Sequence, residues 1–252
     1  IWVDWGEDGL KGILPYDPIY PPARPLIYWA SDTHLGPDYR IERAKEADLV
    51  FFAQYRGCEA MRDAGVKAHW LPHAVETLAY PRFNLASKKH DICFVGHINA
   101  QNRIDALDRM FKEFPNFYYG QLLFEQAAQK YAESKIAFNI RHMDDINMRC
   151  FEVMASGSFL LTNDIPTLHE FFQNGVHLVT YKTLDEAVEK AKYYLTHDEE
   201  REKIADAGCF EVLKRHTFYS RMKQVFETVK ESGLLEKEVV NVSGTSDLDE
   251  RN

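Results

Sequence analysis

The stretch "DDINMRCFEVMASGSFLLTND", residues 144–164, opens with two carboxylates and runs through an amphipathic segment to a glycine. Apolar residues at helical spacing give the segment one buried side, formed by Phe151, Met154 and Ala155. Gly157 suits the left-handed position that ends a helix, because glycine has no Cβ to clash there. The apolar run 159–162 then predicts a strand. A helix followed directly by a strand is the unit from which parallel α/β sheets are built.

The start of this predicted helix is a candidate phosphate site. Asn147 or Asp145 can cap it, since a side-chain oxygen at that position accepts a hydrogen bond from a free backbone N–H. A further apolar run, 136–140, precedes the helix and predicts a strand. A helix that begins beyond the carboxyl end of a strand points its free N–H groups out of the sheet edge. Phosphate groups bind at such edges in doubly wound folds.

Glu152 lies inside the same helix, where its carboxylate can accept two hydrogen bonds from a ribose diol. The spacing also fits a simpler interpretation. Asp144 and Asp145 then only complement the helix dipole, and Glu152 is a solvated face residue. The pattern alone leaves both interpretations open.

Short apolar runs alternate with longer amphipathic ones along the chain, which predicts an α/β fold with parallel sheets covered by helices. Strands are expected at 26–29, 49–53, 69–71, 92–95, 117–119, 136–140, 159–162 and 176–180. The clearest helix is "TLDEAVEKAKYYL", in which Thr183 and Glu186 form a capping box.

Composition fits one large or two small globular domains: the 252 residues are 45% hydrophobic and 27% charged, with a net charge of −9. No apolar run is long enough to span a membrane. The acidic balance argues against a broad nucleic-acid-binding face. Four widely spaced cysteines predict structural thiols in a reducing compartment, hence a cytoplasmic location, with a zinc site as the alternative.

A polar stretch at 80–90 predicts a linker between two domains. We expect a partial N-terminal domain at 1–85 and a fuller domain at 86–215. A helix at 216–231 would return to the first domain, and the tail 233–252 is expected to be flexible because it loses periodicity. The sequence starts without Met inside a run that predicts a strand, so we expect natural residues to precede it.

Two further loops carry candidate binding residues. In "DICFVGHINAQNR", residues 91–103, Gly96 and His97 follow a buried strand, and Arg103 can clamp a diphosphate; an ordinary turn is the alternative. In "YWASDTHLG", residues 28–36, Asp32 and His34 follow another strand. A D-x-H pair can hold a metal, but no third and fourth ligands are evident, and a turn capped by Asp32 is equally consistent.

The ordered series of "SDTH", "WLPHA", "DICFVGH" and "NMRCFEVMASGSFLLTND" resembles the retaining glycosyltransferases of the GT-B fold, closest to the family 4-like branch of the spore maturation protein CgeB. The likeness runs from about Tyr28 to Phe226. It implies two Rossmann-like domains facing each other across a cleft. The N-terminal domain would be reduced or truncated here, and the C-terminal one would hold a nucleoside-diphosphate sugar. It also implies that no metal or other cofactor is needed.

The same resemblance implies roles for individual residues. Two acids eight residues apart mark the donor site of the family. Here Glu152 would hold the ribose, and Asp144 would bind the sugar near the anomeric carbon. The other implied donor-site residues are Asp32, His34, Gly96, His97, Arg103, Asn147, Met148, Arg149 and Glu170. His34, Arg103 and Asp144 would take part in the reaction.

The chain departs from the family pattern in two places. Asp144 stands where the family has a glutamate, and no lysine follows Arg103 closely. The resemblance therefore predicts sugar transfer with retention to an unknown acceptor. The alternatives are a non-catalytic nucleotide-sugar-binding or interaction module, and a sugar-nucleotide epimerase.

Overall fold

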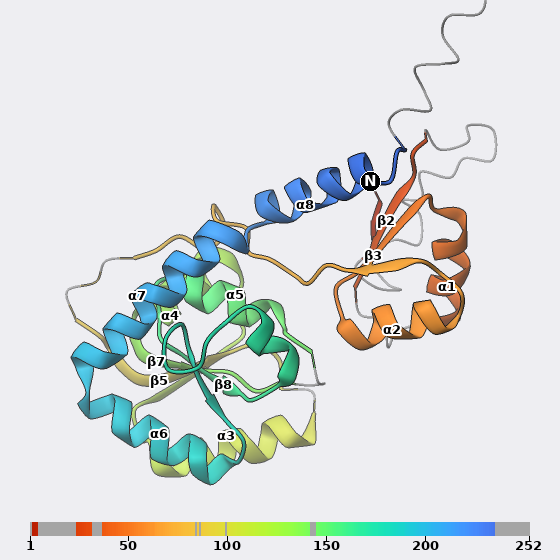
Figure 1. Ribbon diagram of the computed structural model, residues 1–252. Helices are drawn as coiled ribbons and strands as arrows, with labels where there is room; N and C mark the ends of the chain where they lie inside the picture. The colour runs from red at the N-terminus through yellow and green to blue at the C-terminus, as the bar shows by residue number, and fades with distance from the viewer. Residues whose placement is uncertain are drawn as a thin grey trace, which may run out of the picture. The chain divides into compact units, whose positions relative to one another are not determined.

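The computed structural model describes residues 2–4, 24–31, 37–83, 85, 87–98, 100–141 and 145–234. The chain forms two compact units (Figure 1). The first contains the residues up to Pro72 together with those from Arg221 onward, and the second is His73–Ser220. The expected flexible tail lies almost entirely outside the described residues.

The division between the units differs from the predicted boundary at 85/86. Val75 and Tyr80 belong to the hydrophobic core of the second unit, so the chain has already joined that unit before residue 85. The segment has too few apolar residues to show this from its local pattern. On the return, the division falls after Ser220, inside helix α8 (Phe218–Glu231), where 215/216 had been predicted.

The first unit contains a parallel sheet of four described strands in sequential order: β1 (Trp2–Asp4), β2 (Ile27–Ala30), β3 (Leu49–Phe52) and β4 (Ala68–Trp70). Helix α1 (Pro37–Glu46) connects β2 to β3, and helix α2 (Tyr55–Asp63) connects β3 to β4. Its core joins Tyr28 and Phe52 of the strands to Cys58 and Met61 of α2. The buried side chain of Arg221 in α8 donates to the carbonyl oxygen of Pro72 at 2.9 Å. This bond joins the two residues at which the chain leaves the first unit and returns to it.

The second unit contains a five-stranded parallel sheet in the order β6-β5-β7-β8-β9. The strands are β5 (His90–Val95), β6 (Phe117–Gly120), β7 (Ser134–Phe138), β8 (Leu160–Asn163) and β9 (Val179–Tyr181). Strand order reverses between β5 and β7, since the chain first adds β6 on one side and then β7 on the other. Such a reversal is the position at which open α/β sheets bind ligands.

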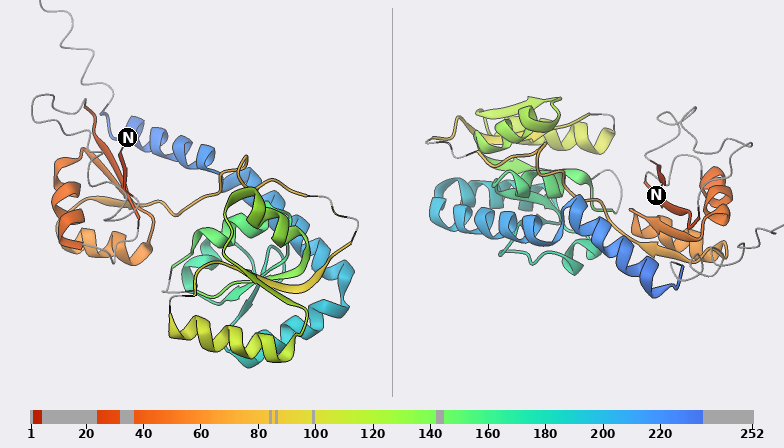
Figure 2. Two further views of the ribbon diagram at one scale, coloured as in Figure 1. Left: turned by 180° about the vertical axis from the view of Figure 1, so that it is seen from behind. Right: turned by 90° about the horizontal axis from the view of Figure 1, so that it is seen from above.

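Helices cover both faces of this sheet (Figure 2). One face packs against α4 (Phe124–Ala132), α5 (Met148–Ala155) and the C-terminal part of α7 (Asp198–Arg215). The other packs against α3 (Gln101–Glu113), α6 (Leu184–Thr196) and the N-terminal part of α7. Within β5, Ile92 and Phe94 enter one core while Cys93 and Val95 enter the other. This explains the uninterrupted apolar runs, because strands covered on both faces need apolar residues at every position.

The α/β class and the predicted strands are confirmed, with bounds shifted by a few residues. The predicted cap of α6 is also present, because the Thr183 hydroxyl accepts from the backbone N–H of Glu186 at 3.2 Å. The carboxylate of Glu186 accepts from the backbone N–H of Lys182 at 2.7 Å, one residue before the cap. Gly157 has a φ of +71°, the left-handed conformation expected where α5 ends.

The four cysteines of the chain are buried and form no disulfide. None of the helices in the described part of the chain is long and apolar enough to cross a membrane.

Glu133 forms a buried charge cluster at the amino edge of the second sheet. It ends α4, its side chain is only 2% exposed, and it pairs with Lys89 at 2.6 Å and with Lys130. Burial alone would raise the pKa of Glu133, but hydrogen bonds from Lys130 and Lys89 lower it to about 2. Because the pKa is depressed in the folded state, the stabilisation is present above the ordinary glutamate pKa and is lost as the pH falls toward 2.

Glu133→Gln is therefore expected to destabilise the protein at pH 7 by about 2 kcal/mol, the typical value of hydrogen bonds to a charged group. The difference from wild type should shrink as the pH falls from the ordinary glutamate pKa toward 2, because the unfolded state takes up a proton at Glu133 before the folded state does. Urea unfolding at several pH values measures this. The control is Glu125→Gln, an exposed position on the same helix, which should change stability by about 0.5 kcal/mol or less. A pH-independent loss for Glu133→Gln would contradict the account.

Candidate functional site

A cavity of about 350 Å³ lies at the carboxyl edge of the second sheet, where the strand order reverses. It contains a group of the predicted site residues: Gly96, His97, Arg103, Arg149 and Glu152. Sequence reasoning missed the other residues that line it: Tyr80, Val95, Gln121, Leu122, Leu123 and Tyr131. Taken together, the lining residues come from the ends of β5 and β6, the first turn of α3, the first half of α5, the last turn of α4 and the segment before β5.

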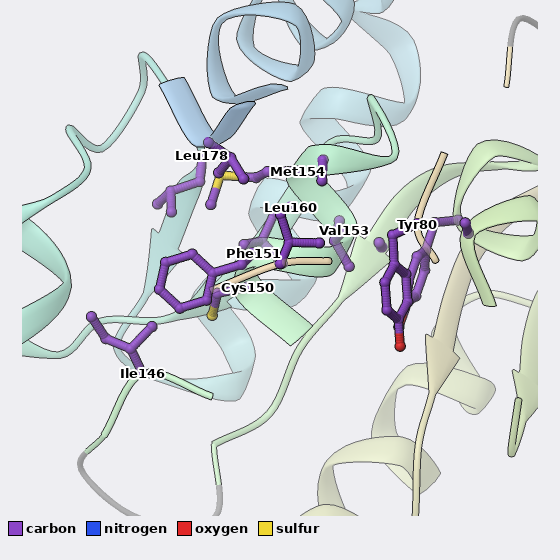
Figure 3. Packing of buried hydrophobic residues seen from close by; sticks show 14 of the residues in the cluster. Tyr80, Ile146, Cys150, Phe151, Val153, Met154, Leu160 and Leu178 are labelled. Carbon is purple, nitrogen blue, oxygen red and sulfur yellow. The ribbon is translucent and has the colours of Figure 1, made fainter. Parts of the chain in front are cut away.

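Helix α5 carries Arg149 and Glu152, and its apolar side fixes its position. Figure 3 shows Phe151 and Met154 packed among Leu160 and Leu178, with Tyr80 at the edge of the same cluster. Phe151 is fully buried. Because this side of the helix is anchored in the core, its other side is held toward the cavity.

Arg149 is held in place by three contacts. Its guanidinium donates to the side-chain oxygen of Asn139 at 2.8 Å and lies 4.7 Å from the ring centroid of Phe94. It also passes directly over Gly96, where a Cβ would collide with a guanidinium nitrogen. Gly96 has a φ of +148°, which side-chain-bearing residues rarely adopt. The glycine after β5 is therefore needed to admit the arginine.

Asn139 organises this corner of the cavity. It follows β7, is buried, and exchanges side-chain hydrogen bonds with Asn147 at 3.2 and 3.3 Å. Its amide also donates to the hydroxyl of Thr162 at 2.9 Å. Asn147 stands at the N-cap position of α5 as predicted, but its side chain makes no capping bond. That prediction was wrong because the bonds to Asn139 replace the cap.

Arg103 lies in the first turn of α3 and is only 9% exposed. Its guanidinium donates to the carbonyl oxygen of His97 at 3.0 Å. Burial, followed by the nearby charge of Arg149, lowers the pKa of Arg103. A cation at the N-terminus of a helix also opposes the helix dipole. Each of these costs would be relieved by an anion bound in the cavity.

Glu152 is the only carboxylate that lines the described cavity, and it is partly buried. Burial raises its pKa, while a hydrogen bond from Tyr80 and the charge of Arg149 act in the opposite direction. This environment rules out the interpretation of Glu152 as a solvated face residue. The cavity therefore has a positively charged side, formed by Arg103 and Arg149, and one carboxylate that can accept hydrogen bonds, Glu152.

The remaining wall is largely apolar, with the amide of Gln121 as a polar member. Leu122 and Leu123 follow β6, and the buried ring of Tyr131 comes from α4. A cavity with arginines on one side and apolar groups on another suits a ligand with an anionic and a planar part.

Several predicted residues do not line this cavity. Asn147 and Met148 are partly buried beside it, and Glu170 is exposed at the end of the short 3₁₀ helix Pro166–Glu170. Asp32, His34 and Asp144 lie outside the described residues.

The residues that sequence reasoning missed differ in how clearly the local sequence marks them. Asn139 is a lone amide inside the apolar run 136–140, which is a signal that sequence reasoning could have used. Tyr80 stands in a polar segment without periodicity, and nothing local marks it as buried.

Gly96→Ala is expected to destabilise the protein by roughly 1–3 kcal/mol, the usual cost of a side chain in a forbidden conformation, and to displace Arg149. The matched control is Gly175→Ala, which has a φ of +77° but open space around the new Cβ. The melting temperature should fall for both variants, whereas the affinity of the cavity for pyrophosphate should weaken only in Gly96→Ala. Equal binding by the two variants would show that Arg149 does not depend on the glycine.

Comparison with known proteins agrees with this geometry. A family model described as "Glycosyl transferase-like" matches residues 69–227, well over half of the chain. The chain belongs to this glycosyl transferase-like family. The spore protein CgeB of Bacillus subtilis (strain 168) is 36% identical over 72 residues, which are 29% of this chain. The match spans only 21% of the length of that relative.

Solved structures with a glycosyltransferase fold are similar to the chain. HepE from Anabaena, solved with UDP-glucose, gives a TM-score of 0.61 at 12% identity, covering 82% of this chain and 72% of HepE. Sucrose-phosphate synthase from Thermosynechococcus elongatus gives 0.58 at 12% identity, covering 86% of this chain and 68% of the synthase. At such identities the likeness concerns the fold, and it confirms the expected GT-B type.

Proposed function

We propose that this member of the family transfers a sugar from a nucleoside-diphosphate sugar to an acceptor, and that the cavity of the second unit binds the nucleoside diphosphate of the donor. The observation that carries the proposal is the placement of Arg103, Arg149 and Glu152 around one cavity where the sheet order reverses.

The two arginines supply the phosphate-binding side. Guanidinium groups bind phosphate oxygens with paired hydrogen bonds, and their charge is worth more in a partly buried site than in water. Arg103 is buried and lies close enough to Arg149 for its pKa to be lowered. A diphosphate would offset this repulsion. For the same reason, no metal ion is proposed: the arginines would supply the positive charge that a cation provides in other sites.

Glu152 and the apolar wall would bind the nucleoside. An ionised carboxylate can accept two hydrogen bonds from the 2′- and 3′-hydroxyls of a ribose. Leu122 and Leu123 then offer apolar surface to the base. HepE was solved with UDP-glucose, which makes UDP-sugars the first donors to test.

The proposed reaction proceeds with retention. The bond between the anomeric carbon and the diphosphate breaks, and the acceptor oxygen attacks from the same face. The leaving phosphate takes the proton of the acceptor. Arg103 would stabilise the negative charge that develops on the diphosphate. Asp144 is proposed to bind the donor sugar, and His34 to take part in the reaction.

The buried free thiols support a proposed cytoplasmic location. The short match to CgeB supports a place in that branch of the family.

The test supplies a panel of UDP-, GDP-, ADP- and TDP-sugars, with and without candidate acceptors. A coupled assay measures the free nucleoside diphosphate that is released. Steady release from one donor, lost in Arg103→Ala, is the expected result. Binding of a nucleotide without any release would favour the non-catalytic binding module. Conversion of the donor to an epimer without an acceptor would instead identify an epimerase.

A further inference from the structure

The backbone of Asn139, which directly follows β7, is fixed by the two strands beyond it, β8 and β9. Its N–H donates to the carbonyl oxygen of Leu161 in β8 at 2.8 Å. Its carbonyl oxygen accepts from the hydroxyl of Tyr181 in β9 at 2.9 Å. Asn139 is also only 1% exposed, so its side chain extends from a rigid position into a packed environment.

The side-chain amide of Asn139 has one chemically consistent orientation. An arginine side chain has only donors, so the atom of Asn139 that lies 2.8 Å from the Arg149 guanidinium has to be the amide oxygen. The amide nitrogen is left to donate to the hydroxyl of Thr162 at 2.9 Å. Asn147 bonds to both ends of the amide, at 3.2 and 3.3 Å, and is compatible with this orientation. The amide oxygen is therefore directed toward the arginine.

Asn139 orients Arg149 without neutralising it. In the described part of the chain, no carboxylate forms an ion pair with Arg149. Its guanidinium is bonded to the neutral amide of Asn139 and lies over the ring of Phe94, 4.7 Å from the ring centroid. Both contacts restrict the position of the guanidinium and leave its charge uncancelled. Because the bond to Asn139 uses one of its N–H donors, the others can serve an anion in the cavity that Arg149 lines.

We propose that Asn139 is a positioning residue for the donor diphosphate, whose amide oxygen fixes the Arg149 guanidinium and leaves its full charge to the phosphates. The ligand named here rests on the function proposed above. An aspartate at this position would keep the acceptor oxygen but would pair with Arg149 as an opposite charge. An alanine would keep the charge of Arg149 available but would release the guanidinium. The two substitutions therefore separate the two properties that the amide combines.

The first test measures the dissociation constant of pyrophosphate by calorimetry in wild type, Asn139→Asp and Asn139→Ala. We expect binding to weaken about tenfold in Asn139→Ala and about 10- to 100-fold in Asn139→Asp, since each loses an interaction with a charged group. The control is Asn163→Asp at the end of β8, where the side-chain oxygen accepts from the backbone N–H of Arg141 at 2.8 Å. This control should weaken binding much less. Wild-type affinity in a folded Asn139→Asp variant would overturn the proposal.

A double-mutant cycle separates positioning of Arg149 from a merely structural role. If Asn139 acts through Arg149, Asn139→Asp should change the pyrophosphate affinity little further in a protein that already carries Arg149→Gln. If Asn139 only supports packing, the same substitution should weaken binding equally with and without Arg149, and the proposal is then wrong.

The second test needs no ligand. In ¹⁵N NMR spectra, the Nη protons of Arg149 are assigned by their absence in Arg149→Gln. They should exchange slowly with water in wild type and rapidly in Asn139→Ala, because the bond to the amide oxygen is lost. Unchanged exchange in a folded Asn139→Ala variant would show that Asn139 does not hold the guanidinium. If wild type binds neither pyrophosphate nor any nucleoside diphosphate, the proposed function fails, while the NMR experiment still decides whether Asn139 positions Arg149.

Discussion

Arg103→Ala should lower the rate of nucleoside-diphosphate release from the donor by about 10² to 10³, the usual effect of removing one preorganised donor at a developing charge. The arginine is buried at the N-terminus of a helix and lies near a second arginine, and an anion bound in the cavity would offset this repulsion. The stability of the unliganded protein should therefore change little, since repulsion from Arg149 is lost together with the bond to the carbonyl oxygen of His97.

The measurement compares release rates and dissociation constants of wild type, Arg103→Ala and the control Arg109→Ala. Arg109 lies on the same helix but is exposed and pairs with Glu113 at 3.0 Å and Asp185 at 3.2 Å. The control should retain wild-type kinetics. Unchanged kinetics in Arg103→Ala would remove Arg103 from the phosphate site.

Glu152→Gln should have opposite effects on stability and on binding. Burial raises the pKa of Glu152, while a hydrogen bond from Tyr80 and the charge of Arg149 act in the opposite direction, so the carboxyl is harder to ionise in the folded protein than in the unfolded chain. For a carboxyl whose pKa is raised by folding, stability is highest at pH values below the ordinary glutamate pKa. It falls as the pH rises through the pKa of the folded state. A neutral glutamine avoids this loss, and the unliganded variant should melt at a higher temperature than wild type at pH 7.

Nucleotide affinity should fall in the same variant by about 10- to 100-fold, because the hydrogen bonds lost are those to a charged acceptor. Thermal unfolding with and without nucleotide measures both effects in one experiment. A lower melting temperature without ligand would show that the carboxylate stabilises the fold. Unchanged affinity would show that Glu152 does not contact the nucleoside.

The sequence predicted those parts of the fold that depend on local patterns. Uninterrupted apolar runs located the strands because both faces of the sheet are covered, as Phe94 and Val95 show by entering different cores. Thr183 and Gly157 were found because helix ends use specific residue types.

The parts that were missed depend on contacts between segments distant in the sequence. Asn147 does not cap α5 because Asn139, which follows β7, engages its side chain. Tyr80 belongs to the cavity only because the chain folds it against α4 and α5, and its polar surroundings predicted a linker. No periodicity encodes such contacts, and the pairing of Arg149 with Gly96 is of the same kind.

Calorimetric titration of the full chain with UDP, GDP, ADP, TDP and the matching monophosphates tests the central claim most directly. The account predicts that at least one nucleoside diphosphate binds, that it binds more tightly than its monophosphate, and that Arg149→Gln weakens it. At a free concentration of 100 times the dissociation constant, such a ligand should also stabilise the fold by about 2.7 kcal/mol. Absence of binding by every nucleoside diphosphate at millimolar concentration, in a chain shown to be folded, would contradict the account.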